Sequence, residues 1–541
     1  MLKTEIKWLW NAWKGNRLQA VANASFGILD VVIQMAQVWA VKHAVDVATH
    51  DTDGNVIFAV GIMLALIFCH FGVIIANIWL KNILGVKAQN RMQQRLLDTL
   101  LRAKWQGKNQ LHSGDVLNRL ETDVKNVITF LTETLPSTVS TLLLFFCAFF
   151  YLFTMDRILA VIVVIMLPMF ILLSKLYMRR MRRLNRDVRN SDSEVQSILT
   201  ETVQNSLLIK TQLQESAMVQ RLENTQAALR ENVKERTKFS VISQLILNTG
   251  FSMTYIVAFG WSAVRLSAGT LTFGGMTAFL QLVTRVQMPA RNLTRLIPQY
   301  VDVLTAVERL MQLEDNPLEE QGEQRVLDGP LGIKLENISF EYTDEETPKH
   351  VISDLSFDFK PQSCNVIVGE TGSGKTTLLR LLLALIKPTA GKITIYNEKT
   401  GEELSPLHRI NYVYVPQGNT ILSGTIRDNL LLGRSDANDN ELHKVLKTAC
   451  AEFVFELPKG IDTNVSEDGI GLSEGQAQRI AIARALLRPG NIMIFDESTS
   501  AVDIDTEEQL LKNILSSQNK TVIFVTHRMS VCKYSDNTLT L

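Results

Sequence analysis

The sequence predicts a multidomain membrane protein, in which an all-α transmembrane domain of six helices with long cytosolic extensions precedes an α/β domain of the P-loop type. Two observations carry this prediction. Six long apolar runs lie before residue 304, and a glycine-rich run, GETGSGKTT at Gly369–Thr377, lies between an apolar strand and an apolar helix. Hydrophobic residues make up 46% of the 541-residue chain, which is high for a chain whose second half reads as a soluble domain.

Each of the six apolar runs reaches the length of about 20 residues that a helix needs to cross a bilayer. The runs are Leu18–Ala48, Val56–Leu80, Leu135–Thr154, Ile158–Met178, Val241–Ala263 and Gly275–Val303. Buried helices of a soluble domain are the alternative. Ile158–Leu173 contains no charged residue, and only Met155–Arg157 separates it from the run before it. We therefore expect a helical hairpin in the membrane.

The charges of the connecting segments predict the orientation. The links after the second and fourth runs are rich in arginine and lysine, whereas the first outer loop carries Asp51 and Asp53 without a basic residue. Basic segments stay on the cytoplasmic side. We expect a multi-pass protein of the plasma membrane or of a bacterial inner membrane, with both termini in the cytoplasm.

Two further segments complete the domain plan. Ile6, Leu9, Trp10 and Trp13 follow helical spacing beside lysines, which is typical of a helix lying in the membrane interface. An acidic segment with proline and glycine, Glu314–Gly322, reads as a linker. The expected domains are residues 1–310, a linker at 311–330, and residues 331–541.

Composition limits the partners. The formal net charge is zero, so no global positive field indicates nucleic acid. The five cysteines show no metal-type spacing, and we expect free thiols.

The glycine-rich run fits the pattern G-x-x-x-x-G-K-S/T, in which backbone N–H groups wrap the phosphates of a nucleotide. Lys375 supplies a cation for the phosphates, and Thr376 supplies a hydroxyl for Mg²⁺. Strand Cys364–Val368 precedes the run and helix Thr377–Leu383 follows it, which is the context the motif requires. A chance glycine-rich loop is the alternative. The expected ligands are therefore a nucleotide and Mg²⁺, with nucleotide contacts from Gly369, Glu370, Thr371, Gly372, Ser373, Gly374, Lys375, Thr376 and Thr377.

A second apolar strand, Ile492–Phe495, ends in Asp496 and Glu497. At the carboxyl edge of a P-loop sheet, Asp496 would hold Mg²⁺ through water and Glu497 would act as the general base toward an attacking water. A simple cap at the end of the strand is the alternative.

These motifs occur in the order of the P-loop, LSEGQ at Leu472–Gln476, Asp496-Glu497 and THR at Thr526–Arg528. The chain resembles the ATP-binding cassette exporters over nearly its whole length. The resemblance implies that LSEGQ is the signature loop, with Ser473, Gly475 and Gln476 contacting ATP bound to the other subunit. An ordinary helix N-cap at Ser473, which would need no partner subunit, is the alternative. It further implies a Q-loop Gln417 that senses Mg²⁺, a switch His527, an adenine-stacking Tyr342, a D-loop Asp503 and an X-loop Glu467. Lys375, Gln417, Glu497 and His527 would carry catalysis, and Thr376, Gln417 and Asp496 would hold the metal.

Three departures accompany the resemblance. Glu474 stands where glycine is commonest in the signature, and Ser466 replaces the usual X-loop glycine. The sequence also stops at Leu541, shortly after the strand before His527, where members of the family usually continue through a further strand and helices. The two inner links, each about 55–60 residues, should be helices that extend into the cytosol and bend at coupling helices near Ser113–Arg119 and Gln204–Lys210.

The family resemblance implies an ATP-driven exporter or flippase that works by alternating access as a dimer of half-transporters, with a homodimer favoured over a heterodimer. An ATP-gated channel or regulatory receptor would share this architecture. A soluble cassette ATPase of the DNA-repair or translation type would lack the six apolar runs.

The substrate prediction rests on charged residues inside the apolar runs. Asp30 lies in the first run, and Arg285, Arg291 and Arg295 lie along the sixth. Charges at membrane depth tend to mark a pathway, so an arginine-lined cavity for an amphiphile, with an anionic one favoured, is the hypothesis. Arg285 pairing structurally with Asp30, and Arg291 and Arg295 reaching the interface, are the alternatives.

Overall fold

The structure is a computed structural model that describes residues 2–15, 17–105, 113–342, 349–370, 372–466, 471–516 and 520–541. Its contacts divide the chain into two compact units. Unit 1 comprises Met1–Leu97 and Gly114–Glu314, and unit 2 comprises Asp98–Ser113 and Asp315–Leu541.

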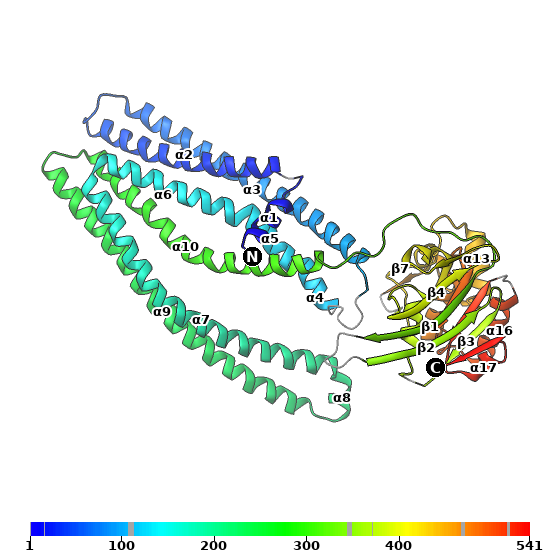
Figure 1. Ribbon diagram of the computed structural model, residues 1–541. Helices are drawn as coiled ribbons and strands as arrows, with labels where there is room; N and C mark the ends of the chain where they lie inside the picture. The colour runs from blue at the N-terminus through cyan, green and yellow to red at the C-terminus, as the bar shows by residue number, and fades with distance from the viewer. Residues whose placement is uncertain are drawn as a thin grey trace. The chain divides into compact units, whose positions relative to one another are not determined.

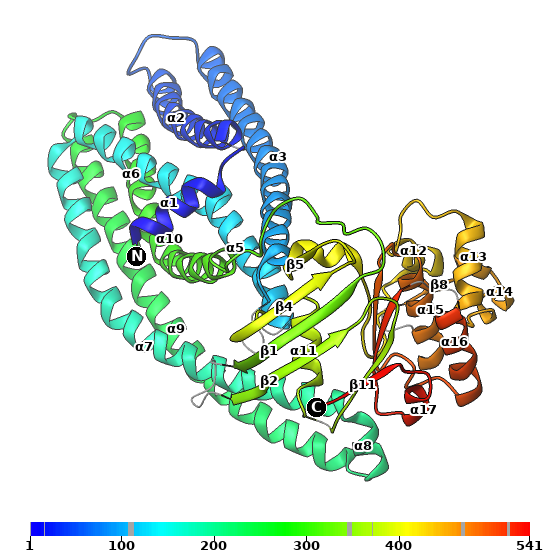
Figure 2. The same ribbon diagram turned by 45° about the vertical axis from the view of Figure 1, so that its right-hand side comes forward.

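Unit 1 is built from six long helices. They are α2 (Arg17–Ala48), α3 (Val56–Arg102), α6 (Leu135–Met155), α7 (Arg157–Gln204), α9 (Glu215–Ser267) and α10 (Phe273–Glu314). Helices α7 and α9 lie side by side along their length and are joined through the short α8 (Ser206–Thr211), as both views show (Figure 1, Figure 2). The shorter elements are α1 (Leu2–Ala12), α4 (Ser113–Asn118), π-helical η2 (Arg119–Asp123), α5 (Val124–Thr129) and π-helical η3 (Phe130–Thr134).

The helices agree with the expected apolar runs and inner links. Each of the six runs falls wholly within one long helix. Within the described residues, four helical stretches are long and apolar enough to cross a membrane: Ala20–Ala48, Val56–Arg102, Gly114–Met155 and Glu215–Ser267. Helices α3, α7 and α9 extend well beyond their apolar runs, and α4 and α8 lie where the bends were predicted.

Large apolar side chains are exposed on these helices, so water would be an unfavourable solvent for the helices. On α3, Phe58, Phe68 and Trp79 are each about 70% exposed. A soluble domain would bury such a row, whereas a helix in lipid keeps it on the outside.

The tight link between α6 and α7 is held by one aspartate. Asp156 caps the N-terminus of α7 by accepting hydrogen bonds from the backbone N–H groups of Ile158 (2.9 Å) and Leu159 (3.1 Å). Its other oxygen accepts from Trp261 Nε1 at 3.1 Å and pairs with Arg265 at 3.2 Å, both on α9. The helical hairpin is therefore fixed to a third helix.

Helix α1 differs in part from the predicted interfacial helix. Ile6 and Trp10 are 59% and 65% exposed, as a membrane-facing side requires. Leu9 and Trp13 instead pack against a buried cluster of unit 1, and Trp13 lies beyond the end of the helix. The apolar stripe is thus shared between the outer surface and the protein core.

Unit 2 contains two main sheets, visible side-on in Figure 2. The antiparallel sheet has the order β2-β1-β4-β5, with β1 (Gly332–Tyr342), β2 (Lys349–Phe359), β4 (Ala390–Tyr396) and β5 (Gly401–Glu403). The parallel sheet has the order β11-β3-β10-β9-β6, with β3 (Cys364–Val368), β6 (Tyr412–Val415), β9 (Ile492–Asp496), β10 (Thr521–Val525) and β11 (Asn537–Thr540). A short pair, β7 (Gly424–Thr425) and β8 (Asn464–Val465), completes the strands.

Helices accompany both sheets. They are α11 (Lys375–Leu382), 3₁₀-helical η4 (Pro406–Asn411), α12 (Ile426–Leu431), α13 (Asp439–Thr448), α14 (Phe453–Glu456), 3₁₀-helical η5 (Gly460–Asp462), α15 (Glu474–Leu486), α16 (Ile504–Ser516) and α17 (Met529–Cys532). Strands β9 and β10 are almost wholly buried, as expected for apolar strands of a parallel sheet covered on both faces.

The predicted strands at Cys364–Val368, Ile492–Phe495 and Thr521–Val525 are confirmed, the second with one more residue. The predicted helix after the glycine-rich run begins two residues earlier, at Lys375.

Candidate functional site

The order of the parallel strands brings four motifs to one edge. Strands β3, β10, β9 and β6 are consecutive neighbours, and the carboxyl ends of parallel strands lie at the same edge. The glycine-rich loop follows β3, and His527 follows β10. Glu497 follows β9, and Gln417 follows β6. Residues from four distant stretches of the sequence therefore line up beside one another.

The glycine-rich loop has the geometry of an anion cradle. Gly372 and Gly374 have φ values of 89° and 103°, which residues other than glycine rarely adopt. Lys375 begins α11 and is only 8% exposed, and its ammonium donates to the Gly369 carbonyl at 2.6 Å. The buried Ser373 hydroxyl has no hydrogen-bond partner among the described residues. A buried orphan hydroxyl, a lysine and a helix N-terminus together suit a polyphosphate.

Glu497 is clamped from both sides. Gln417 Nε2 donates to Glu497 Oε2 at 2.7 Å, and His527 Nε2 lies 2.7 Å from Glu497 Oε1. Glu497 itself has a left-handed backbone with φ of 45°, and its N–H donates to the Val525 carbonyl at 2.9 Å. Lys375 Nζ lies 3.3 Å from both ring nitrogens of His527. The structure thus brings together all four residues that the sequence assigned to catalysis.

The neighbouring carboxylate of Asp496 is arranged differently. Burial raises the pKa of Asp496, and the charge of Glu497 raises it further, while the hydroxyl of Tyr414 at 3.3 Å and Lys375 oppose these effects. Burial together with Asp496 also raises the pKa of Tyr414. A desolvated carboxylate without a strong cationic partner suits a site that a metal ion would neutralise.

The described residues do not by themselves form a metal cluster of three or more acidic, histidine or cysteine side chains. This agrees with the way Mg²⁺ is bound in phosphate sites, through one or two protein groups, phosphates and water. Thr376 is exposed on the first turn of α11. Of the predicted nucleotide contacts, Thr371 lies outside the described residues, as does the X-loop Glu467.

The signature segment caps its own helix. Ser473 is the N-cap of α15: its hydroxyl accepts from Gln476 N at 3.2 Å, and Gln476 Oε1 accepts from Ser473 N at 2.9 Å. Ser473 and Glu474 are both exposed. Among the described residues, the structure records no bond from Ser473 to the glycine-rich loop of its own chain. The N-cap that the sequence left as the alternative is present, and its outward face stays available to a ligand.

Gly475 is required by a close approach. A Cβ at this position would lie 2.5 Å from the Ala501 carbonyl oxygen. Gln478, one turn along α15, accepts from the Ala501 N–H at 3.2 Å. The signature helix and the segment Ser500–Asp503 are therefore packed as one piece. Asp503 caps α16 by accepting from Thr506 N at 3.0 Å, and this hydrogen bond lowers its pKa.

Arg528 is a structural support that the sequence reasoning quoted within a motif without giving it a role. It donates to the carbonyl oxygens of Ser500 (2.6 Å) and Val502 (3.2 Å) and to the buried Glu507 at 3.0 Å. The residue after His527 thus holds the segment that precedes Asp503. Its signal in the sequence was a charged residue directly after the switch position.

Tyr342 belongs to a stack of cationic and aromatic groups. Its hydroxyl accepts from Arg380 Nη1 at 3.0 Å and lies 3.3 Å from the Thr377 hydroxyl. The guanidinium of Arg380 lies 4.2 Å from the ring centre of Trp105, which also belongs to unit 2. The sequence reasoning missed Trp105, because only the fold brings it to this place.

In unit 1, Asp30 and Arg285 meet through a third residue. Asp30 Oδ2 accepts from Gln34 Nε2 at 2.7 Å, and Gln34 Oε1 accepts from Arg285 Nη1 at 2.6 Å. Asp30 Oδ1 also lies 2.9 Å from His70 Nε2. This arrangement is close to the structural pairing that the sequence left open. Arg291 lies in α10, and its side chain is outside the described residues, as is that of Arg295.

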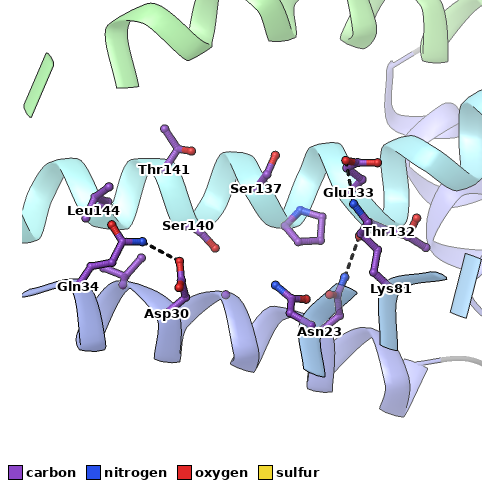
Figure 3. Close-up of a pocket in the computed structure, with 14 residues that line it drawn as sticks. Asn23, Asp30, Gln34, Lys81, Thr132, Glu133, Ser137, Ser140, Thr141 and Leu144 are labelled. Atoms are coloured by element: carbon purple, nitrogen blue, oxygen red, sulfur yellow. Dashed lines mark hydrogen bonds and ion pairs between the residues drawn. The ribbon is translucent and has the colours of Figure 1, made fainter. Parts of the chain in front are cut away.

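Asp30 also faces a pocket of about 300 Å³ formed by α2, α3, η3 and α6 (Figure 3). Arg285 does not line it. An ion pair of Lys81 and Glu133, 2.8 Å apart, closes one end, and Asn23 Nδ2 donates to the Thr132 carbonyl at 2.8 Å. The pocket is lined by Asn23, Gly27, Asp30, Val31, Gln34, Asn77, Lys81, Thr132, Glu133, Pro136, Ser137, Ser140, Thr141 and Leu144.

Known proteins match both halves of the chain. The family described as ABC transporter transmembrane region matches residues 22–290, and the family described as ABC transporter matches residues 352–500. An "ATP-dependent lipid A-core flippase" of Bordetella avium is 29% identical over 89% of this chain and 81% of its own length. A "Putative multidrug export ATP-binding/permease protein" of Staphylococcus aureus is 28% identical over 81% of this chain and 76% of its own.

A solved structure supports the fold over the whole length. The "Structure of a bacterial Atm1-family ABC exporter with ATP bound" matches with a TM-score of 0.81, covers 98% of this chain and 94% of its own, and is 23% identical. With the nucleotide motifs gathered at one sheet edge and the apolar helices preceding them in the sequence, the chain belongs to the ABC transporter family, as an exporter-type half-transporter whose ATPase is coupled to transport.

Proposed function

We propose that two copies of this chain form an exporter or flippase that moves an amphiphile out of the cytoplasm or the inner leaflet by alternating access. The observation that carries the proposal is the clamp on Glu497 by Gln417 and His527, beside Lys375. A single chain contains every group assigned to the chemical step. Two identical chains would then form two competent sites, which favours a homodimer over a heterodimer.

In this proposal Glu497 is the general base for the attacking water. His527 and Gln417 hold the two oxygens of its carboxylate, so its free lone pairs are fixed in direction. Lys375 would move from the Gly369 carbonyl to the phosphates, and the Ser373 hydroxyl would gain a partner. Bound Mg²⁺ supplies charge neutralisation on the phosphates, and Thr376, Gln417 and Asp496 are the residues we assign to hold it. Tyr342 would stack on the adenine.

Ser473 provides the argument for a shared seam between copies. Its hydroxyl and the N-terminus of α15 are exposed, and within the described part of the chain they do not bond to the glycine-rich loop. A helix N-terminus with free N–H groups attracts an anion. We infer that the anion is the γ-phosphate bound to the partner copy, with Gly475, Gln476 and Asp503 setting the position of this surface.

For transmission to the membrane we assign α4 and α8 as coupling helices. An ion cluster ties α4 to the far end of α10: Asp115 pairs with Arg119 at 2.8 Å and with Arg309, and Arg309 pairs with Asp123 at 3.2 Å. Arg119 and Asp123 are buried. A push on α4 would therefore move α10 as well, since Arg309 on α10 pairs with carboxylates on both α4 and the adjoining η2.

The transported class we propose is amphiphilic, because the relatives include a lipid A-core flippase and putative multidrug exporters. The proposed location is a plasma membrane or bacterial inner membrane with both termini in the cytoplasm, where ATP is found. Nucleic acid has no part in the proposal.

Crosslinking tests the seam. In a cysteine-free background, cysteines replace Ser473 and Ser373, and the protein is trapped with Mg²⁺, ATP and vanadate. We expect a chain of doubled mass on oxidation, formed between copies and absent from the Ser473→Cys variant alone. No crosslink between copies after vanadate trapping, in a preparation that hydrolysed ATP before vanadate was added, would contradict the proposal.

Reconstitution separates the pump from the channel. Liposomes with ATP outside should accumulate substrate against its gradient only when Glu497 is intact. Single-channel currents that open with ATP, without uphill movement, would instead favour the gated channel.

A further inference from the structure

We propose that the pocket between α2, α3 and α6 binds the protonated amine of a cationic amphiphile, with Asp30 as its counter-ion. This inference rests on the proposed function, because it names the substrate class of the membrane half. It also departs from the anionic amphiphile that the arginines of the sixth run suggested.

The charges that line the pocket carry the first step. Its charged side chains are Asp30, Glu133 and Lys81, and Lys81 and Glu133 neutralise each other at 2.8 Å. Asp30 is the remaining charge. Two basic side chains lie near Asp30 outside the pocket lining: His70, whose Nε2 lies 2.9 Å from Asp30 Oδ1, and Arg285, which reaches the opposite side of the Gln34 amide. A ligand in this space meets a carboxylate and no free cation among the described lining residues.

The hydrogen-bonding capacity of the lining carries the second step. Asp30 Oδ1 and Asn77 Oδ1 are buried atoms without a hydrogen bond in the described residues, although His70 lies 2.9 Å from the former. Both atoms are acceptors. Unsatisfied acceptors are costly at membrane depth. The pocket therefore lacks hydrogen-bond donors for these oxygens. An ammonium group supplies three donors and a positive charge.

The shape of the pocket carries the third step. A volume of about 300 Å³ is at the small end for ligand sites and suits a head group rather than a whole lipid. At Gly27, a Cβ would lie 2.4 Å from the Ser140 hydroxyl, so the glycine lets α2 approach α6 at the pocket wall. Figure 3 shows Asp30 and Gln34 on one helix, with the side chain of Ser140 on the neighbouring helix turned toward them. The Ser140 hydroxyl and the Asp30 carboxylate together form a polar surface for an ammonium group.

An anionic head group fits this wall poorly. Phosphate oxygens are acceptors, and they would meet two carboxylates and the amide oxygen of Asn77. The charge of Lys81, the one basic side chain among the described lining residues, is already balanced by Glu133. Two amphiphiles with the same alkyl chain and head groups of opposite charge therefore allow a direct comparison of binding.

The test uses the full chain in phosphatidylcholine nanodiscs and three probes with the same C12 chain: dodecylamine, dodecanol and dodecyl phosphate. Binding of radiolabelled probe is measured without nucleotide, and ATPase stimulation is measured relative to each variant's own basal rate. We expect dodecylamine to bind at least about tenfold more tightly than either other probe, the effect of one charge-assisted hydrogen bond.

The variants locate the effect. Asp30→Asn keeps the size of the side chain and removes its charge, and should weaken dodecylamine binding about tenfold or more. Asp30→Glu should retain most of the binding. Asp51→Asn, a matched change at an exposed loop position, should leave binding and basal activity unchanged. If Asp30→Asn does not fold, Ser140→Leu, which fills the pocket from α6, should give the same loss.

The outcomes are separable from those of the proposed function. Equal binding of dodecylamine and dodecyl phosphate, or unchanged dodecylamine binding in both Asp30→Asn and Ser140→Leu, overturns the inference even if ATP hydrolysis is normal. Loss of hydrolysis or of dimer formation in the unmodified protein overturns the proposed function, and leaves the nucleotide-free binding measurement to decide on the pocket.

Discussion

Replacing Glu497 by glutamine tests the assignment of the base most directly. Glutamine has nearly the same shape, and its single oxygen can keep one of the two contacts that Gln417 and His527 make at 2.7 Å with the separate oxygens of Glu497. The main chemical change is the loss of the basicity of the carboxylate. A positioned general base contributes roughly 10²- to 10⁴-fold in rate. Steady-state turnover should fall by about that factor, which raises the barrier by about 3 to 5 kcal/mol.

The assay measures phosphate release and nucleotide binding on the same preparation. ATP affinity should remain within a few-fold, because the binding groups around Lys375 are untouched. Glu508→Gln is the matched control: Glu508 lies on α16 and pairs with Lys512 at 2.9 Å, and its loss should leave turnover unchanged. Turnover of Glu497→Gln close to that of the unmodified protein would refute the role of Glu497 as the base.

Three further predictions follow from the same edge of the sheet. Burial raises the pKa of Asp496 above its ordinary value of 3.8, so its charged form opposes folding. Nucleotide-free protein should therefore gain stability as the pH falls through the raised pKa. Asp496→Asn should raise the Tm at neutral pH and remove that pH dependence, and an unchanged Tm profile would contradict the prediction. Gly475→Ala should lower ATPase turnover at least tenfold, because its Cβ would lie 2.5 Å from a carbonyl oxygen. Gly61→Ala should leave turnover unchanged, because a Cβ at Gly61 would meet no atom within 4 Å. Equal activities of the two variants would contradict the packing argument. Arg528→Gln should lower the Tm of the full chain, because it leaves the buried Glu507 without its cation at a cost of about 3 to 5 kcal/mol, and an unchanged Tm would remove Arg528 from this role.

The outcome at Ser473 shows how two predictions for one residue can both hold. The sequence offered an N-cap or a phosphate contact. The hydroxyl accepts from its own helix, and the residue is also exposed. An N-cap oxygen has a second lone pair and a proton to donate, so the cap does not use up the group. The second lone pair and the hydroxyl proton of Ser473 therefore remain available to a group on the partner copy.

The sequence alone was enough to predict the class of each half and to propose the residues of the nucleotide site. Apolar runs of membrane length and the loop Gly369–Thr377 act locally, because a span depends on its own composition and a phosphate loop on its own glycines. Motif spacing was therefore enough to name Lys375 and Glu497.

The sequence alone does not show which side chains come into contact, because this depends on the tertiary structure. The strand order β3-β10-β9-β6 places Gln417 and His527 on either side of Glu497, a result of sheet topology that no single segment contains. Arg285 was assigned to a cavity from its position in an apolar run, whereas its side chain is engaged by Gln34. A helix presents residues to several neighbours, and sequence periodicity gives the face but not the partner packed against it. For that reason the pocket around Asp30 emerged only when α2, α3 and α6 were packed together.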